Sequence, residues 1–358
     1  METSVSTSAF PEISPGLPVE IGRIDKELGK LWETSDDTKT RASLINLVIY
    51  TESAAQVAAN TELISRIASH HACRAILIFA NPSAAEANAS AWISAHCHNA
   101  GKGARQICSE QITFQLDGDT ASAVPNVVFS HLDSDLPLCF WWQGDLPSAP
   151  DENLWSWVDR LIFDSQTWSD PAVQFARVCE ISHLSRSRTI LCDLNWTRLL
   201  TARFALANVF DHAAALPALR DVKKLTIRHT KQARTTAILL AGWLAAQLGW
   251  ALESVLGRHA FRDKRNAEVG FDLIEADGAC ISVVEILSAS ATITLRRESN
   301  AEFFHASIRP AAGPDVTQML PAGRDSLREH LLMELSRGGV HPLYAKALDL
   351  IRPVFSHD

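Results

Sequence analysis

The chain has 358 residues and lacks the short motifs that identify many enzymes. No G-x-G-x-x-G follows an apolar run, so the glycine fingerprint of dinucleotide binding is absent. The segment GKGAR (101–105) does not have the spacing of a Walker A loop, and G-x-S-x-G, H-E-x-x-H and C-x-x-C do not occur. These absences favour a protein that is not an enzyme and that binds no cofactor.

Positive charge and long apolar runs are also scarce. Lys and Arg number 33 against 41 Asp and Glu, and the net charge of −8 opposes binding to nucleic acid. No run of about 18 apolar residues occurs, so we expect no contact with a membrane through a spanning helix. The polar N-terminus lacks a basic start followed by an apolar block, so we expect no signal peptide. Seven scattered cysteines favour reduced thiols in a cytoplasmic protein over a secreted disulfide scaffold.

What the sequence does contain is an alternation of apolar runs and helical stretches between residues 36 and 185. Strands are expected at 43–50, 74–79, 105–116, 136–142 and 160–165, and helices at 54–70, 81–93 and 170–182. Strands that alternate with helices form βαβ units. This region is therefore predicted to be an α/β domain with a mostly parallel, Rossmann-like open sheet and helices on both faces.

The rest of the chain follows different patterns. Residues 1–35 are expected to form an N-terminal arm and a helix. In 186–358, Asp193 is suited to cap one helix, and a long second helix is expected to end at Gly249. Four short strands at 268–276, 280–287, 291–298 and 302–309 are separated by turn signals, and two helices follow. We predict an α+β C-terminal domain with an antiparallel meander.

Tryptophan is the residue used most unusually. There are ten Trp but only two Tyr, and the run LPLCFWWQG (136–144) ends in two adjacent Trp. Neighbours in a strand point to opposite faces, so one interpretation buries both rings under different helix layers. The other notes that they end a strand, where open α/β sheets bind ligands. On that interpretation the candidates for binding a partner are Trp141, Trp142, Gln143, Asp164 and Ser165.

Histidine and cysteine are concentrated between residues 70 and 108. Both types suit zinc, but HCH (96–98) is expected on a helix, where its members point in different directions, and no pair has the spacing of a zinc finger. We therefore expect no metal site. Cys73 precedes the second expected strand and Cys108 lies within the third. On neighbouring strands the two would form a redox pair. The alternative is two inert thiols, because free cysteine is among the most buried residue types.

Several segments occur in the order in which a known protein family has them. They are SLINLVIY, HHACRAILIF, CSEQI, DLPLCFWWQGDLP, DRLIFDS, DLNWTRL and LLMELSRGGVHPLYAKAL. Together they resemble the OpcA family, the glucose-6-phosphate dehydrogenase assembly or activator proteins of cyanobacteria and actinobacteria. The resemblance runs from about residue 40 to about residue 350. The sequence departs from the family in HHACRAI, where a His-Pro-Cys pattern is expected, and in Gly338-Gly339.

The resemblance implies a non-catalytic, allosteric activator that binds glucose-6-phosphate dehydrogenase and promotes its active oligomer in the oxidative pentose phosphate pathway. It also implies redox regulation with thioredoxin as a further partner, which bears on Cys73 and Cys108. Trp141 or Trp142 would form the dehydrogenase contact or stiffen the sheet edge that does. Two alternatives stay open. One is a sugar-phosphate enzyme or ligand-binding protein that uses the carboxyl edge of the sheet, with Asp164 as catalytic candidate. The other is a metal- or redox-sensing module.

Overall fold

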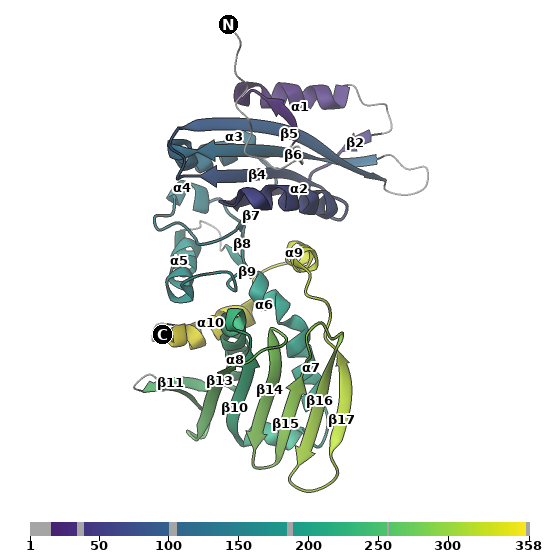
Figure 1. The fold of residues 1–358 in the computed structure, drawn as a ribbon, viewed down its shortest axis with the longest axis vertical. Helices are drawn as coiled ribbons and strands as arrows, with labels where there is room; N and C mark the ends of the chain where they lie inside the picture. The colour runs from purple at the N-terminus through teal and green to yellow at the C-terminus, as the bar shows by residue number, and fades with distance from the viewer. Residues whose placement is uncertain (1–15, 34–38, 100–105, 185–188, 256–257, 356–358) are drawn as a thin grey trace. The chain divides into compact units, whose positions relative to one another are not determined.

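The computed structural model describes residues 16–33, 39–99, 106–184, 189–255 and 258–355. The chain forms two compact units, coloured along the sequence in Figure 1. Unit 1 contains the chain up to Phe163, with Arg177–Leu191 and Leu331–Gly338. Unit 2 contains Asp164–Ala176, Cys192–His330 and the chain from Gly339 onward. Each unit is thus built from three separate stretches of the chain.

The first sheet has the strand order β1-β5-β6-β4-β3-β7-β8-β9, with β2 beside β6. Its strands are β1 (Leu17–Val19), β2 (Lys39–Arg41), β3 (Ile45–Thr51), β4 (Cys73–Asn81), β5 (Asn88–Asn99), β6 (Gln106–Asp117), β7 (Leu138–Trp142), β8 (Arg160–Phe163) and β9 (Ile190–Asp193). Strands β6, β4, β3, β7 and β8 are parallel neighbours, and β1 and β5 form an antiparallel edge. The predicted mostly parallel sheet is confirmed.

Helices cover both faces of this sheet, as predicted. They are η1 (Ile21–Arg23), α1 (Ile24–Glu33), α2 (Ala54–Ala68), η2 (Gly118–Ala123), α3 (Val124–His131), α4 (Glu152–Trp155) and α5 (Pro171–Leu184). Glu110 and Gln111 are neighbours on β6 and therefore point to opposite faces. Glu110 accepts a hydrogen bond from Trp32 of α1 at 2.6 Å, and Gln111 donates one to Thr61 of α2 at 3.1 Å. Because both faces are covered, β3 and β4 are almost continuously apolar and buried.

The helix expected at 81–93 is wrong. Residues from Asn88 onward form β5, which pairs with β6 over twelve residues. The segment is rich in alanine, which favours helices, but long-range pairing with a neighbouring strand overrides local propensity. His96, Cys97 and His98 therefore alternate along a strand instead of winding around a helix. The sequence also missed β9, whose short apolar run precedes Asp193.

Unit 2 is built on a second sheet of order β11-β12-β13-β10-β14-β15-β16-β17. Its strands are β10 (Val222–His229), β11 (Ala251–Val255), β12 (Arg258–Arg262), β13 (Glu268–Glu275), β14 (Ile281–Ser288), β15 (Ala291–Arg296), β16 (Phe303–Pro310) and β17 (Val316–Pro321). All neighbours are antiparallel except β10 and β13. The predicted α+β class is confirmed, whereas β11, β12 and β17 were not expected.

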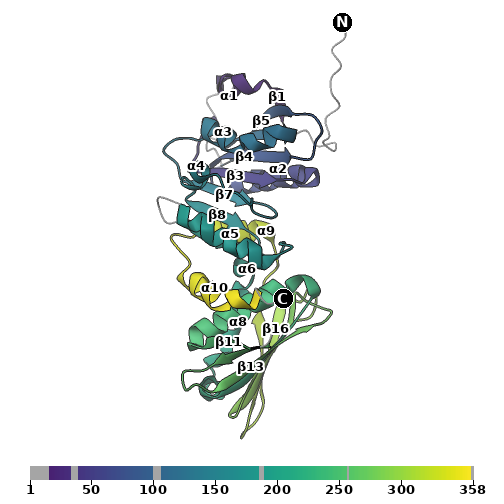
Figure 2. The ribbon, with the colours of Figure 1, turned by 90° about the vertical axis from the view of Figure 1, so that its left-hand side faces the viewer.

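The helices of the second half are α6 (Leu194–Arg198), α7 (Leu200–Phe210), η3 (Leu216–Arg220), η4 (Lys231–Ala233), α8 (Arg234–Leu248), α9 (Leu327–Ser336) and α10 (Pro342–Phe355). Helix α8 is buried on nearly all sides, and α10 packs beside it (Figure 2). Gly249 ends α8 with a φ of 70°, a left-handed conformation that favours glycine. Within the described residues, no helix combines the length and apolar character that a membrane span requires.

Candidate functional site

The carboxyl ends of β3 and β7 meet at the point where the strand order reverses. From β3 the chain continues to β4 on one side of it and later returns to β7 on the other side. Open α/β sheets bind ligands outside the carboxyl ends of the strands at such a switch point. A ligand of this sheet would therefore meet the residues that end β3 and β7, among them the predicted Trp142 and Gln143.

Two aromatic rings cover these strand ends. Tyr50 of β3 is registered with Trp142 of β7, and their rings stack with centroids 3.8 Å apart and planes at 17°. The Trp142 ring also lies 5.7 Å, between centroids, from that of Trp155 in α4. The exposed fractions of Tyr50 and Trp142 are 6% and 7%. The protein's own side chains thus occupy the switch point.

Polar side chains at this edge pair with one another. Asn60 of α2 donates a hydrogen bond to Gln143 Oε1 at 3.0 Å, and Gln143 donates one to Asn60 Oδ1 at 2.9 Å. The Tyr50 hydroxyl donates to Glu52 at 2.7 Å, and Trp142 Nε1 donates to a main-chain oxygen of the following turn at 2.8 Å. Burial and the hydrogen bond to Glu52 raise the pKa of Tyr50. The aromatic and amide groups at this edge therefore make their hydrogen bonds within the protein.

Trp141 lies on the other face of β7, with an exposed fraction of 3%. Its neighbours in register are Ile49 and Ile162. Both rings are therefore buried on opposite faces of the sheet in unit 1, as the interpretation that places them in the core predicts. Neither ring is accessible for direct contact with a partner in this arrangement. Support of the sheet edge is the part of the partner hypothesis that this geometry still allows.

Ser165, another predicted candidate, belongs to unit 2 and to a buried network around Asp193. Ser165 donates to Asp193 through Oγ at 2.7 Å and through its main-chain nitrogen at 3.1 Å. Two further donors reach the same carboxylate: the main-chain nitrogen of Asn195 at 2.9 Å and the Tyr344 hydroxyl at 3.1 Å. Burial, with the charge of Asp164 as a second cause, raises the pKa of Asp193 to about 7.

Asp164 is held in a two-point ion pair with Arg198. The guanidinium Nη2 lies 2.8 Å from Oδ2 of Asp164, and Nη1 lies 3.2 Å from Oδ1. Arg198 also contacts Asp325 at 3.2 Å. Both carboxylate oxygens of Asp164 are thus engaged by one planar cation, an arrangement that fixes orientation. This geometry suits a structural ion pair better than the general base that the enzyme alternative requires.

The sequence assigned Asp193 only the role of a helix cap, and the structure confirms that role at the start of α6. The larger network was missed. A short apolar run followed by an acidic residue had singled out Asp164, and ILCD at 190–193 repeats that pattern. Tyr344 and Asn60 lie within helices and have no such local signal.

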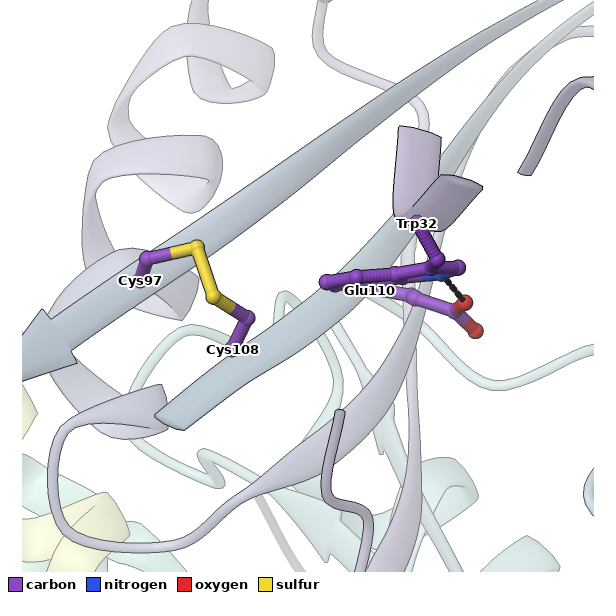
Figure 3. Close-up of a disulfide and its surroundings, with 4 residues drawn as sticks. All are labelled: Trp32, Cys97, Cys108 and Glu110. Atoms are coloured by element: carbon purple, nitrogen blue, oxygen red, sulfur yellow. Dashed lines mark hydrogen bonds between the residues drawn. A yellow bond between two sulfur atoms is a disulfide. The ribbon is translucent and has the colours of Figure 1, made fainter. Parts of the chain in front are cut away.

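The cysteine pair differs from the expected one. Cys97 of β5 and Cys108 of β6 lie opposite each other and form a disulfide, with their Cα atoms 4.0 Å apart (Figure 3). The register of β4 against β6 sets Cys73 level with Ser109, so Cys73 and Cys108 point to opposite faces of the sheet. Burial raises the pKa of Cys73 to about 12, which disfavours its reactive thiolate. Cys73 is therefore a buried free thiol, and Cys108 has a different partner.

Two family models match most of the chain. Both describe domains of the glucose-6-phosphate dehydrogenase subunit of the OpcA type. The model of its N-terminal domain matches residues 64–180, and the model of its C-terminal domain matches residues 189–348. The match to the N-terminal domain precedes the match to the C-terminal domain along the chain.

Curated relatives agree with the family models. The chain is 31% identical over 166 residues to a putative OxPP cycle protein OpcA of Synechococcus elongatus, with 45% of this chain and 36% of the relative aligned. It is 29% identical over 191 residues to a protein of the same name from Nostoc punctiforme, with 51% of this chain and 39% of the relative aligned. The chain thus spans less than half the length of these relatives.

Among solved structures, a levoglucosan dehydrogenase bound to NADH and levoglucosan is similar over 89% of this chain and 96% of that one, with a TM-score of 0.46 and 10% identity. A biliverdin reductase of Synechocystis is similar over 88% of this chain and 98% of that one, with a TM-score of 0.45 and 9% identity. Similarities this distant carry no conclusion about activity. On the two domain models together, the chain belongs to the OpcA family of glucose-6-phosphate dehydrogenase assembly proteins.

Proposed function

We propose that this chain is a non-catalytic partner of glucose-6-phosphate dehydrogenase, which it binds and whose active oligomer it promotes. The family match carries the proposal, because both domain models are described as parts of a glucose-6-phosphate dehydrogenase subunit. The names of the relatives supply the pathway, the oxidative pentose phosphate cycle. An activator of this kind acts by binding one state of its partner more tightly than another, and it needs no reactive centre of its own.

The Tyr50–Trp142 stack favours a binding protein over an enzyme that uses a dinucleotide cofactor. A dinucleotide in its usual position would need the switch point and a glycine-rich turn after the first parallel strand. In this chain the segment that leaves β3, TESAAQV (51–57), has no glycine, and the stacked rings occupy the strand ends. The ion pair of Asp164 with Arg198 weighs against the sugar-phosphate enzyme in the same way.

Thioredoxin enters the proposal through the Cys97–Cys108 disulfide. The reduced dithiol of a thioredoxin would give two electrons to this disulfide and become oxidised to a disulfide itself, while two thiols form at Cys97 and Cys108. Cys97 is exposed and Cys108 is buried, so Cys97 offers the accessible sulfur. Activation of the dehydrogenase is therefore best measured with both the oxidised and the reduced protein.

The test is a titration of this protein against glucose-6-phosphate dehydrogenase from the same organism, at several glucose 6-phosphate concentrations. We expect a saturable rise in activity or a fall in apparent KM, with a larger oligomer in size-exclusion chromatography. The protein alone, with glucose 6-phosphate and NADP+, should show no turnover. Absence of both activation and complex in either redox state would contradict the proposal, and turnover by the protein alone would favour the enzyme.

A further inference from the structure

A groove lies at the opposite edge of the first sheet from the Tyr50–Trp142 stack, beside the amino end of β7. Its volume is about 750 Å3, and all its lining residues belong to unit 1. They are Phe129, Leu132, Asp133, Ser134, Asp135, Leu136, Pro137, Leu138, Ser156, Trp157 and Asp159. We call this feature the amino-edge groove. It combines an apolar floor with acidic side chains and includes no lysine or arginine.

Two exposed aromatic side chains form one wall of the amino-edge groove. Phe129 of α3 and Trp157, just after α4, meet edge to face with their ring centroids 6.4 Å apart. Their exposed fractions are 38% and 57%. The other aromatic residues of α4 and β7 are buried, so this pair stands out against its own surroundings. Large exposed apolar side chains gathered at a concave site are typical of an interaction surface.

The loop at 133–136, which also lines the groove, is held in place by a buried side chain. Asn46, at the start of β3, is completely buried, and its side chain makes three hydrogen bonds to the main chain of the loop at 133–136. It donates to the oxygens of Asp133 and Leu136 at 2.9 and 3.0 Å, and its Oδ1 accepts from the nitrogen of Asp133 at 2.9 Å. Asp159 accepts from the main-chain nitrogen of Leu138 at 2.8 Å. A groove fixed in this way loses little conformational entropy when it is filled.

The charge of the groove is negative and partly uncompensated. Asp133 pairs with Arg74 at 3.0 Å, and Asp159 is engaged by the main chain. Asp135 is exposed and makes no ion pair with any residue that the structure describes. Asp135 lines the groove together with the apolar side chains, and we call its carboxylate the rim of the groove. A complementary ligand therefore carries an apolar group for the floor and a positive charge for the rim.

We propose that the amino-edge groove binds a segment of a partner protein in which an apolar side chain is followed or preceded by lysine or arginine. The apolar side chain packs against Phe129 and Trp157, and the cation pairs with Asp135. Tryptophan is among the residue types that most often dominate binding energy at protein interfaces. The identity of the partner rests on the proposed function, under which the segment belongs to glucose-6-phosphate dehydrogenase.

The first experiment measures the affinity of the dehydrogenase for four variants. Trp157→Ala and Phe129→Ala remove the wall, and Asp135→Lys reverses the charge of the rim. The matched control is Phe204→Ala, which removes an aromatic side chain that is 66% exposed on α7 of unit 2. We expect Trp157→Ala to weaken binding by about tenfold or more and Phe204→Ala to leave it unchanged. Asp135→Lys should weaken binding severalfold and reduce its sensitivity to added salt.

A second experiment tests the groove without the dehydrogenase. The probe is a fluorescein-labelled peptide of alternating leucine and lysine, and its control is the same peptide with glutamate in place of lysine. Fluorescence anisotropy should show saturable binding of the lysine peptide and no binding of the glutamate peptide. The Trp157→Ala and Asp135→Lys variants should lose this binding, and the Phe204→Ala variant should keep it.

The two experiments separate two kinds of failure. If the wild-type protein binds the dehydrogenase and the groove variants bind it equally well, the groove proposal is overturned and the proposed function stands. If the wild-type protein does not bind the dehydrogenase at all, the proposed function fails, and the peptide experiment decides the groove by itself. Equal binding of both peptides, or of neither, would then overturn the groove proposal.

Discussion

At the scale of single residues, opposing effects act on Asp193. Burial disfavours its charged form, whereas hydrogen-bond donors from Ser165, Asn195 and Tyr344 favour it. The outcome is a pKa raised from 3.8 to about 7. Because the folded-state pKa lies above the unfolded value, the native protein holds an extra proton on Asp193 between these two pH values. The neutral carboxyl can donate its own proton to a hydroxyl of Ser165 or Tyr344.

We predict that Asp193 makes the free energy of unfolding fall as the pH rises from 3.8 to about 7. A shift of this size corresponds to at most about 4 kcal/mol. Asp193→Asn imitates the protonated form and should remove this contribution. Urea unfolding followed by circular dichroism at about pH 5 and about pH 8 would show the wild type losing stability relative to the variant.

The comparison with Asp193→Asn is needed because other groups titrate in the same range. Burial lowers the pKa of several histidines, among them His96 and His131, which makes stability rise with pH. These histidines are the same in both proteins, so their effect cancels in the difference. If wild type and variant show parallel pH profiles, the pKa of Asp193 is not raised.

Single residues were predicted from the sequence as far as local pattern reaches. Asp164, Ser165, Trp141 and Trp142 were chosen as candidates because each lies at the end of an apolar run. What binds them was not visible, since Arg198 and Tyr50 come from other elements and their contacts depend on strand order. The same limit explains the wrong cysteine pair. Cys97 was assigned to a helix, so its position opposite Cys108 was not anticipated.

At the scale of elements, the contact between α8 and α10 depends on Gly242. A Cβ atom at this position would lie 2.7 Å from Cγ2 of Ile351 and 3.2 Å from the main-chain oxygen of Ala347. Ile351 is completely buried, so its side chain has little room to move. The missing side chain therefore allows the two helices to approach closely.

We predict that Gly242→Ala destabilises unit 2. Overpacking costs about 1–3 kcal/mol, and because Ile351 has little room to move we expect a cost above the gain of about 1 kcal/mol from the better helix propensity of alanine. The matched control is Gly29→Ala in α1, where nothing lies within 4 Å of the new methyl group and only the propensity gain is left. Thermal unfolding should show a lower Tm for Gly242→Ala and an equal or higher one for Gly29→Ala. A rise in both would mean that α8 and α10 separate without cost.

Elements were predicted well where their pattern was long and apolar, as in β3, β4 and α8. Failures share a cause. Strands β5, β11, β12 and β17 are partly exposed. Their sequence patterns can be interpreted as strands only once the neighbouring strands are known. Twelve registered pairs with β6 hold β5 extended, and these pairs come from a segment that follows it in the chain. Local propensity cannot report such partners.

At the scale of the whole molecule, aromatic side chains serve two purposes that the sequence did not distinguish. Trp142 is buried in a stack at the carboxyl edge of the first sheet, whereas Trp157 is largely exposed at the amino edge. Composition flagged the whole region as rich in tryptophan, and only the fold separates the two environments. The buried ring of Trp142 therefore contributes to stability, and the exposed ring of Trp157 is available to bind a partner.

We therefore predict opposite outcomes for two alanine variants. Trp142→Ala should lower the free energy of unfolding by about 3–5 kcal/mol, because it leaves a cavity beside Tyr50. Its folded fraction should still bind the dehydrogenase with an affinity within about threefold of the wild type, since the ring is not at the surface. Trp157→Ala should lose binding while its stability stays within about 0.5 kcal/mol. Urea unfolding and titration of the dehydrogenase, at a temperature where both variants are folded, measure the two quantities. A folded Trp142→Ala protein that fails to bind would instead move the partner contact back to the carboxyl edge, where the amide pair of Gln143 and Asn60 would be the next residues to change.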